Sequence, residues 1–558
     1  MKRVSYYGLT AIGLMTILFI RCSKGSSSSS TSNPPQNFSL SSWSLNGKNS
    51  QALIYDIPKN ISLQLNFSNA IDRNSVPGII TLKDNSGTAA TINVSYSHSD
   101  SNLLITTASA LHNLTKYKIS INANLKSKDG GNLNLPTDIS FITSIDSSDK
   151  FPVISDSALL DLVQKQTFSY FWDFGHPISG LARERDNSGE TVTTGGSGFG
   201  IMSLVVGVNR NFISRSEGLA RMQKIVSFLR NTAQKFHGAF PHWLNGTTGV
   251  VIPFSAKDDG ADLVETSYLM QGLLTARQYF NGVDTMETNL RANIDSLWNG
   301  VQWNWFRKNN EDVLYWHWSP NYNWDMNFPI HGWNEALITY ILAASSTTYS
   351  IPKSVYDNGW ALNGAIRNGK TFFGVQLPLG PDLGGPLFFS HYTFLGVNPN
   401  NLTDAYADYG KQTKAHTLIN HNYCQANPNN FYGYSDSCWG LTASDDVNGY
   451  SAHSPTNDDG VISPTAALSS FPYDPADAMK ALHFFYYKLG DKIWKQYGFV
   501  DAFSLKDLWF ANSFLAIDQG PIIVMIENYR SGLLWNLFMS CPEVKNGMKG
   551  LGFAGPNL

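Results

Sequence analysis

The sequence is poor in charge and in cysteine. Charged residues make up 15% of its 558 residues, and the formal net charge is −3. Without a basic excess, the chain has no electrostatic basis for binding nucleic acid or an acidic membrane surface. Its four cysteines are too few for a disulfide scaffold of this size. No Cys/His spacing indicates structural zinc, so we expect neither a metal nor another cofactor.

Several catalytic signatures are also absent. The chain has no G-x-S-x-G nucleophile turn and no P-loop. Residues 194–200 read TGGSGFG, which is rich in glycine but lacks the G-x-G-x-x-G spacing of a dinucleotide-binding turn. We expect a tight loop there that lets the backbone approach a cleft.

Aromatic side chains are abundant instead. They make up 13% of the residues, nearly as many as the charged ones. This balance favours a ligand that stacks on rings over one held by ion pairs. The length predicts more than one domain.

The amino terminus resembles a bacterial export signal. Met1-Lys2-Arg3 is followed by an apolar run from Leu9 to Ile20, which is short for a membrane span. Residues 1–22 are predicted as a lipoprotein-type signal peptide ending at Cys22, although Arg21 stands where such signals usually carry Gly or Ala. The alternative is an ordinary secretory signal with an incidental cysteine. Either way we expect an exported protein, anchored in the outer membrane if Cys22 is lipidated, with its membrane face undetermined.

Two domains are predicted after a Ser/Pro-rich tether at residues 23–37. Alternating apolar residues and regular turn signals over 38–145 predict a β-sandwich. Its Phe67-Ser68-Asn69-Ala70-Ile71-Asp72 stretch resembles bacterial Ig-like modules, for which a spacer role is expected and sugar binding is the lesser alternative. In the second domain, residues 153–558, Cys424 and Cys438 either form a disulfide or remain buried thiols.

The second domain has helical periodicity. Helices are predicted near 156–172, 214–235, 262–280, 286–300, 333–346, 403–424, 475–489 and 519–539, with shorter ones near 198–209 and 463–470. Some are apolar on nearly every face and others are amphipathic. An inner ring of buried helices inside an outer amphipathic ring describes an α/α toroid. An irregular helical array is the alternative.

Carboxylates stand where two of these helices begin. Asp262 and Glu265 precede an apolar run with the spacing of a capping box, so Asp262 could serve only as a helix cap. The residues after Glu265 are apolar on every face of the predicted helix. A carboxylate in such surroundings needs a hydrogen-bonding partner or a functional role. Asp258 lies in the preceding loop and is either solvated or part of the same site.

Glu335 has the surroundings of a general acid. It follows His331 and Trp333, and a partly dry site against an indole favours the neutral carboxyl group. The dipole at a helix N-terminus would oppose this by favouring the anion. A helix-entrance acid without a catalytic role therefore remains possible.

Further candidates lie on either side of this region. The indoles of Trp316 and Trp324 could stack on sugar rings, although tryptophans in helical domains are more often core residues. Downstream, Asp445, Asp518 and Glu527 place more acids near inner helices. Glycoside hydrolysis needs two carboxylates, so this distribution suits it.

Long strings in residues 155–558 resemble the bacterial putative-glucoamylase family, also classed as glycoside hydrolase family 144. They include ETSYLMQGLL from Glu265, WGLTASD from Trp439, DGVISPTAA from Asp459 and IDQGP from Ile517. The resemblance implies an (α/α)6 barrel and inverting hydrolysis of β-1,2-glucan. It also implies that acids matching Asp258 or Asp262, Glu265 and Glu335 matter for activity.

We therefore expect an exported, monomeric hydrolase of β-1,2-glucan or its oligosaccharides. Glu335 would be the general acid and Asp518 the base, with Glu265 also in the catalytic set. The residues expected to bind sugar are Asp258, Asp262, Trp316, Trp324, Trp333, His331, Asp445 and Glu527. Three alternatives remain: a hydrolase of another glucan, including α-glucan, a polysaccharide lyase using His391 and Tyr392, and a non-catalytic glycan-binding protein.

Overall fold

The structure is a computed structural model that describes residues 37–50 and 52–558. The predicted signal peptide with Cys22, and the tether up to residue 36, lie outside the described residues. The described chain divides into two compact units. One comprises residues 37–50, 52, 60–110 and 118–140, and the other comprises 53–59, 111–117 and 141–558.

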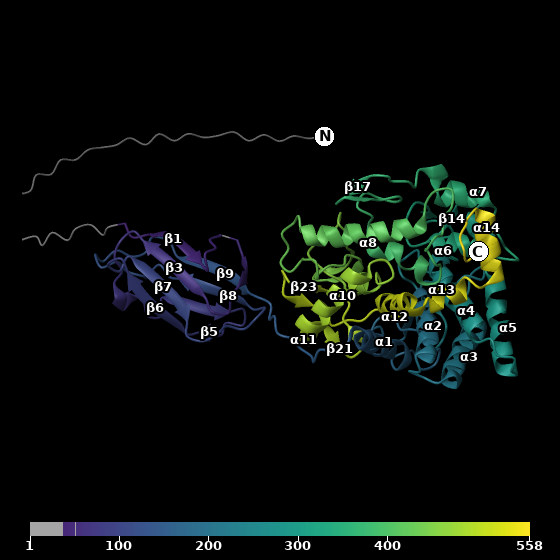
Figure 1. Cartoon of the computed structure of the whole chain (residues 1–558), viewed down its shortest axis with the longest axis horizontal. Helices are drawn as coiled ribbons and strands as arrows, with labels where there is room; N and C mark the ends of the chain where they lie inside the picture. Colours follow the sequence, from purple (N-terminus) through teal and green to yellow (C-terminus); the bar gives the residue numbers. More distant parts are fainter. Residues whose placement is uncertain (1–36, 51) are drawn as a thin grey trace, which may run out of the picture. The chain divides into compact units, whose positions relative to one another are not determined.

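Strands β1 to β9 form two sheets in the amino-terminal part of the chain (Figure 1). Their orders are β1-β3-β7-β6 and β2-β9-β8-β4-β5. The pairs are antiparallel in the first sheet, whereas β2 runs parallel to β9. In β3, Leu63, Leu65 and Phe67 are buried and alternate with more exposed residues, which is the pattern of a sheet with one covered face. The bounds are β1 (Leu40–Leu45), β2 (Ile54–Ile57), β3 (Ser62–Phe67), β4 (Ile80–Asp84), β5 (Ala89–Ala90), β6 (Ile92–Ser97), β7 (Asn102–Thr107), β8 (Lys116–Ile121) and β9 (Thr137–Thr143).

Helices dominate the chain from residue 156 onward. The longer ones are α1 (Asp156–Trp172), α2 (Thr194–Asn209), α3 (Arg215–Asn231), α4 (Leu263–Tyr279), α5 (Thr285–Gly300), α8 (Tyr409–Ala426) and α12 (Ala516–Ser531). The shorter ones are α6 (Leu337–Ser345), α7 (Lys353–Val355), α9 (Pro464–Leu468), α10 (Pro475–His483), α11 (Gly490–Ile493), α13 (Leu533–Phe538) and α14 (Pro542–Leu551). No helix in the described part of the chain has the length and apolarity needed to cross a bilayer.

Short strands lie in the connections between these helices. They are β10 (Thr191–Thr193), β11 (Trp243–Asn245), β12 (Val251–Ile252), β13 (Ala261–Asp262), β14 (Leu314–Tyr315), β15 (His317–Trp318), β16 (Pro329–Ile330), β17 (Thr371–Phe372), β18 (Val375–Gln376), β19 (Ala443–Asp446), β20 (Gly449–Ala452), β21 (Trp494–Lys495), β22 (Gly498–Phe499), β23 (Phe503–Ser504) and β24 (Trp509–Phe510). They pair mostly in twos, so they order the long loops without forming a large sheet.

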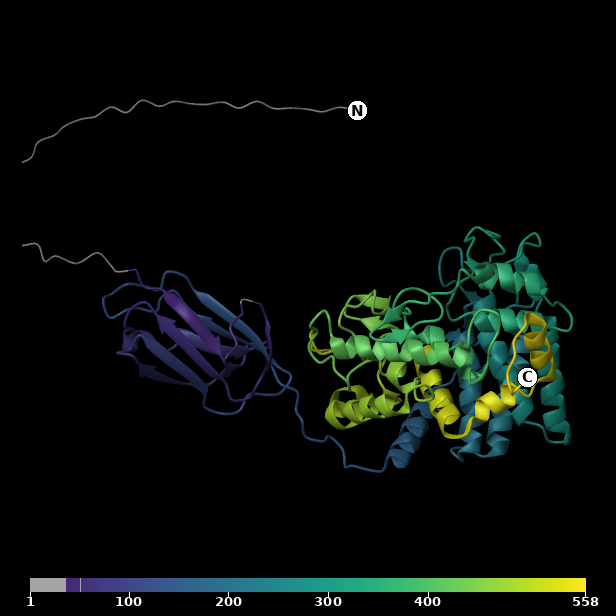
Figure 2. The same ribbon diagram turned by 45° about the horizontal axis from the view of Figure 1, so that its top comes forward.

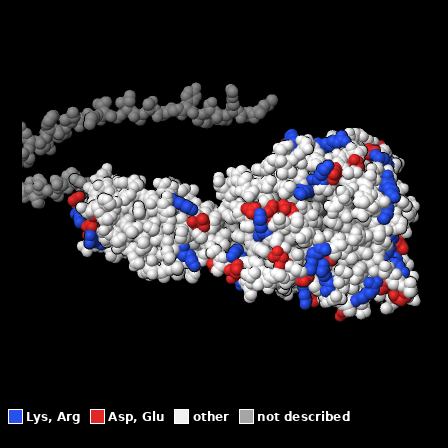
Figure 3. All heavy atoms as spheres, in the orientation of Figure 1, with Lys and Arg blue, Asp and Glu red and all other residues white. Residues whose placement is uncertain are grey.

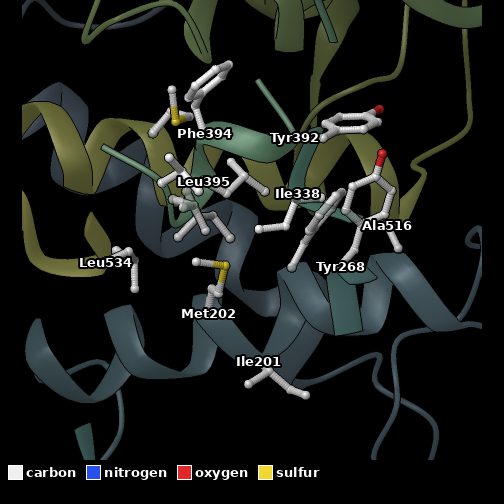
Figure 4. Close-up of a cluster of buried hydrophobic side chains, with 14 of the residues drawn as sticks. Ile201, Met202, Tyr268, Ile338, Tyr392, Phe394, Leu395, Ala516 and Leu534 are labelled. Carbon is white, nitrogen blue, oxygen red and sulfur yellow. The ribbon is translucent and has the colours of Figure 1, made fainter. Parts of the chain in front are cut away.

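Three buried helices, α2, α4 and α12, carry the centre of the core. Of the carboxy-terminal helices, yellow in Figures 1 and 2, α12 and α13 lie between the green and the teal segments, and α14 lies among the teal ones. Figure 4 shows side chains from α2, α4, α6, α12 and α13 meeting there, together with Tyr392 and Phe394 from the connection before α8. A helix buried on nearly every side reads as continuously apolar, which is why its periodicity is weak in the sequence.

The glycine-rich segment at residues 194–200 is helical, which corrects the predicted loop. It forms the first turns of α2, and all seven residues are buried. A Cβ on Gly198 would lie 2.1 Å from the carbonyl oxygen of Tyr268, and one on Gly272 would lie 2.3 Å from the carbonyl oxygen of Gly198. The glycines therefore let the backbones of α2 and α4 touch. Close helix packing, rather than a turn, accounts for the composition.

Other helix bounds also differ from the prediction. The predicted helix at 519–539 is two helices, because Gly532 adopts a left-handed φ of 69° and ends α12. The predicted helix at 333–346 begins only at Leu337, after turns in which Asn334 Oδ1 accepts the N–H of Ala336 at 2.9 Å. Glu335 therefore lies in front of α6 and not in its first turn.

Cys424, Cys438 and Cys541 are buried free thiols, which decides against the Cys424–Cys438 disulfide. The surface reflects the low charge of the sequence. On the face drawn in Figure 3, the few charged atoms of both signs are scattered among uncharged ones.

Candidate active site

Asp262 and Glu265 occupy the start of α4. Asp262 Oδ1 accepts the backbone N–H of Glu265 at 2.9 Å, so the predicted helix cap is present. The reciprocal half of the capping box is not formed, because the N–H of Asp262 donates to the carbonyl of Phe240. Glu265 Oε2 instead accepts the N–H of Gly195, in the first turn of α2, at 2.7 Å. The side chain of Glu265 thus joins two inner helices.

Two histidines face these carboxylates. His242 Nδ1 lies 3.0 Å from Asp262 Oδ2, and His317 Nδ1 lies 3.3 Å from Asp258 Oδ1 and 3.7 Å from Asp262 Oδ2. Asp258 is only 3% exposed, which places it in the site and not in solvent. The antiparallel pairing of β13 with β15 sets Asp262 opposite His317. Neither histidine was singled out from the sequence, and the pairing that brings His317 to Asp262 joins residues 55 positions apart.

The histidines and carboxylates in this cluster stabilise each other's charged forms. Burial opposes the charged form of His242, but Glu265 and Asp262 raise its pKa to about 9. Burial likewise opposes the ionisation of Asp262, but His317 and His242 outweigh it and lower the pKa. Glu265 behaves differently: burial raises its pKa to about 6 despite the opposing effect of His242. At neutral pH the cluster therefore holds ion pairs with protonated imidazole.

His242, Asp258 and Asp262 also offer ligand atoms within 4.8 Å of one another, a spacing that could hold a cation. A metal would need the neutral imidazole of His242. The carboxylates keep that ring protonated at neutral pH, so the ion pairs compete with metal binding.

Glu335 is the half-buried acid beside this cluster. Burial raises the pKa of its carboxyl group to about 7, its own backbone N–H opposes that rise, and the charges of Glu265 and Asp262 add to it. The backbone is fixed by Thr393 Oγ1, which donates to the carbonyl oxygen of Glu335 at 2.7 Å. Both side-chain donors, Thr393 and Tyr268, bond to this backbone carbonyl, and within residues 37–50 and 52–558 no side chain donates a hydrogen bond to the carboxyl group of Glu335. A group with this pKa can deliver a proton near neutral pH.

Tyr268 and Tyr392 connect this cluster to a second one. Their rings meet edge to face with centroids 5.6 Å apart, and both hydroxyl groups point toward the same side in Figure 4. After burial, the charge of Glu335 raises the pKa of Tyr268, while Asp518 and, more weakly, Glu335 raise that of Tyr392. The pKa of Tyr392 therefore responds to the charges of both Glu335 and Asp518.

The second cluster contains Asp445, Asp501 and Asp518. Asp518 lies in the first turn of α12 and is 2% exposed, and Asp501 is 1% exposed. The N–H of Asp445 donates to Asp501 Oδ2 at 2.7 Å, and Arg185 Nη1 lies 3.2 Å from Asp445 Oδ1. The structure thus brings Asp518 and Asp445 together and adds two residues that the sequence did not single out, Asp501 and Arg185.

The remaining candidates lie in different surroundings. Trp316 is partly buried and stacks on the half-exposed Phe328, with centroids 5.4 Å apart. Trp324 packs against the core, Trp333 is buried, and His331 is exposed. His391 is buried, which lowers the pKa of its ring to about 3.

Glu527 does not belong to the site. Its side chain is fully buried, and its two oxygens accept from Arg210 at 2.7 and 3.1 Å. Gln164 and Ser531 donate two further hydrogen bonds. These bonds leave no exposed oxygen for a sugar, so the expected sugar-binding role was wrong. Sequence alone could not distinguish this acid from Asp518, which lies on the same helix.

Comparisons with known proteins identify both parts of the chain. Residues 327–542 match the family model described as putative glucoamylase, and residues 47–143 match the bacterial Ig-like domain. The crystal structure of a putative glucoamylase from Bacteroides uniformis is 56% identical and has a TM-score of 0.72. The match covers 73% of this chain and 100% of that one. The chain belongs to this glucoamylase-like family.

Other relatives of the family carry more specific names. An endo-β-1,2-glucanase from Chitinophaga pinensis, in complex with sophorotriose and glucose, is 53% identical with a TM-score of 0.71 over 73% of this chain and 100% of that one. An exo β-1,2-glucooligosaccharide sophorohydrolase from Parabacteroides distasonis is 45% identical over 425 residues. That match covers 72% of this chain but only 59% of the sophorohydrolase.

Proposed function

We propose that this protein is a glycoside hydrolase that cleaves β-1,2-glucan or its oligosaccharides by inverting general acid/base hydrolysis. The two named relatives support the substrate class. The placement of Glu335 is the observation that carries the chemistry: a half-buried carboxyl group with a pKa of about 7, beside a cluster of ionised acids and histidines.

In this mechanism Glu335 donates its proton to the glycosidic oxygen as the bond to the anomeric carbon breaks. Asp518 accepts a proton from the attacking water, directly or through a substrate hydroxyl group. Glu265 supports Glu335, because its negative charge helps to keep the acid protonated. Tyr392, whose pKa responds to the charges of both Glu335 and Asp518, is proposed to line the space between acid and base.

Asp258, Asp262 and Asp445 are proposed to bind sugar hydroxyl groups. Their oxygens are acceptors held in place by His317, His242 and Arg185, respectively. Trp316 would offer its indole face to a sugar ring. Trp324, Trp333 and His331 are kept as weaker candidates, because the two tryptophans pack against or within the core and His331 is exposed.

The barrel architecture and the cellular location are proposals as well. We propose that the helices of residues 153–558 form an (α/α)6 barrel, preceded by the Ig-like domain at 38–145. Buried α2, α4 and α12 as inner helices support the barrel. We also propose export as a monomer and anchoring through a lipid on Cys22. Metabolic labelling with an alkyne fatty acid, compared between the wild type and Cys22→Ala, would test the anchor.

The function is tested by incubating the purified protein with β-1,2-glucan, starch and laminarin and measuring the chain length of the products. We expect oligosaccharides from β-1,2-glucan alone. Products from starch alone would favour hydrolysis of α-glucan, the activity that the name of the family suggests. An ultraviolet-absorbing unsaturated product would indicate a lyase. Binding of the glucan without release of any product would indicate a non-catalytic glycan-binding protein.

A further inference from the structure

Two half-exposed phenylalanine rings flank the acid cluster at the start of α4, which contains Asp258 and Asp262. Phe254 and Phe328 are each 51% exposed. Single apolar side chains are common on protein surfaces, so exposure alone indicates no function. These two are distinguished by their contacts, because each ring stacks on one of the histidines that face the acids.

Phe254 covers one side of His242. The two ring centroids are 4.2 Å apart with an interplanar angle of 26°, and Trp243 meets the phenyl ring edge to face at 4.9 Å. The backbone N–H of Phe254 donates to the carbonyl oxygen of Asp258 at 2.9 Å. His242 Nδ1 is itself 3.0 Å from Asp262 Oδ2. The phenyl ring is thus held against the acid cluster while half of the residue remains open to solvent.

Phe328 occupies the corresponding place beside His317. It stacks on Trp316 with centroids 5.4 Å apart and lies nearly parallel to His317, at 6.3 Å and 13°. The N–H of Trp316 donates to the carbonyl oxygen of Phe328 at 3.0 Å, which fixes the two backbones together. Because His317 Nδ1 lies 3.3 Å from Asp258 Oδ1, this stack also ends at the acid cluster.

The loops that carry the two rings, 251–260 and 319–328, are joined to each other. Ser319 Oγ and Asn321 Nδ2 donate to the carboxylate of Asp259 at 2.5 and 2.6 Å. These bonds hold the two loops together beside the acids. The rings therefore belong to one fixed wall of the candidate active site.

Exposed aromatic rings are concentrated in the same part of the chain. Seven phenylalanine, tyrosine and tryptophan side chains are exposed within residues 37–50 and 52–558. Four of the seven belong to residues 254–328, namely Phe254, Trp305, Tyr322 and Phe328. Apolar surface in water is unfavourable, and a ligand that covers it gains free energy. The segment that supplies the acids therefore also supplies apolar faces for a ligand.

We propose that Phe254 and Phe328 are stacking platforms for glucosyl residues of the β-1,2-glucan chain that lie outside the bond being cleaved. This inference rests on the proposed hydrolysis of that glucan. A pyranose ring presents an apolar C–H face that a phenyl ring covers well, and a neutral chain needs no charged partner. An imidazole separates each phenyl ring from the carboxylates, so a sugar on the outer face lies beyond the residue whose bond is cleaved.

The platforms should act on binding and not on the chemical step. A contact to a distant sugar is equally strong in the ground state and in the transition state, so its loss raises KM and leaves kcat unchanged. Only a chain long enough to reach the platform makes the contact. The effect should therefore depend on the length of the substrate.

The test is a comparison of kcat and KM for the wild type, Phe254→Ala and Phe328→Ala on β-1,2-glucooligosaccharides of increasing length. For the longest substrates we expect KM to rise about tenfold in each variant, while kcat changes by less than about twofold. The shortest oligosaccharide that the wild type cleaves should show no change. Phe254→Tyr and Phe328→Tyr keep the ring and should retain the wild-type KM, whereas Phe254→Leu and Phe328→Leu keep only the apolar volume and should not.

Phe373→Ala is the matched control, because Phe373 is 43% exposed and lies in the turn between β17 and β18. It should leave KM unchanged at every length. A loss of kcat that is the same at every length would mean that the ring only supports its histidine, and would overturn the proposal. An unchanged KM on all substrates in both alanine variants would also overturn it. Melting temperature checks folding.

Binding separates this inference from the proposed function. In a Glu335→Gln background, which holds the chain without cleaving it, calorimetry should show that β-1,2-glucan binds about tenfold more weakly after Phe254→Ala or Phe328→Ala. If the wild type cleaves another glucan, the proposed function fails, and the same length series on that glucan tests the platforms. Equal affinity with and without the rings would contradict the platforms whichever glucan is cleaved.

Discussion

The backbone N–H of Gly195 donates a hydrogen bond of 2.7 Å to Oε2 of Glu265. This contact links the first turn of α2 to the first turn of α4, and it needs a glycine, because a Cβ on residue 195 would lie 2.5 Å from that oxygen. The packing of two inner helices thereby sets the position of a site carboxylate. The candidate catalytic cluster is therefore part of the core and is not an addition to the surface.

Glu265→Gln should shift the alkaline limb of the pH–activity profile to lower pH. Glu265 raises the pKa of Glu335, so removal of its charge lowers the pKa of the acid, which then loses its proton earlier as pH rises. The measurement is kcat/KM from pH 4 to 9. Glu311→Gln, an exposed glutamate on the neighbouring loop, is the control. An unmoved limb would mean that Glu335 does not set it.

His242→Gln should remove a pH-dependent part of the stability. The folded-state pKa of His242 is about 9, above the ordinary value of 6.5. Its contribution is therefore complete below about pH 6.5 and is lost as pH rises through about 9. We expect the wild type to lose roughly 2 kcal/mol of its unfolding free energy between these limits relative to the variant. Urea unfolding at both pH values measures this, and parallel losses in the two proteins would refute the ion pair.

Gly198→Ala should destabilise the fold strongly. Its methyl group would meet the backbone of Tyr268 at 2.1 Å, and two helix backbones cannot separate without disrupting the core. We expect a loss of about 3 kcal/mol, measured by thermal or urea unfolding. Gly550→Ala, in α14, is the matched control because nothing lies within 4 Å of its added carbon. That variant should be neutral or slightly stabilising, since alanine is the better helix former.

The sequence predicted the elements whose signals are local. The cap at Asp262 and the buried helix after Glu265 follow from spacing and apolar runs, and the structure has both. The partners of these acids could not be predicted, because His242 and His317 arrive through β-pairing and loop packing across long stretches of chain. At residues 194–200 the glycine-rich composition led to the wrong prediction of a loop, because glycine occurs in closely packed helices as well as in turns.

The same limit explains the errors among the acids. Asp518 and Glu527 lie on one helix, yet the charge of Asp518 affects Tyr392 whereas Glu527 forms an ion pair with Arg210. The surrounding segments, and not the local sequence, decide the partners of each carboxylate. The position of Glu335 before α6, rather than within it, likewise depends on a turn that periodicity does not predict.

The most direct test of the account is hydrolysis of β-1,2-glucan by the wild type and by Glu335→Gln, followed by the release of reducing ends. A general acid contributes roughly 10²- to 10⁴-fold, so we expect the variant to lose at least about 100-fold in kcat while keeping its melting temperature and its affinity for the glucan. Folded Glu335→Gln that hydrolyses β-1,2-glucan at close to the wild-type rate would contradict the account.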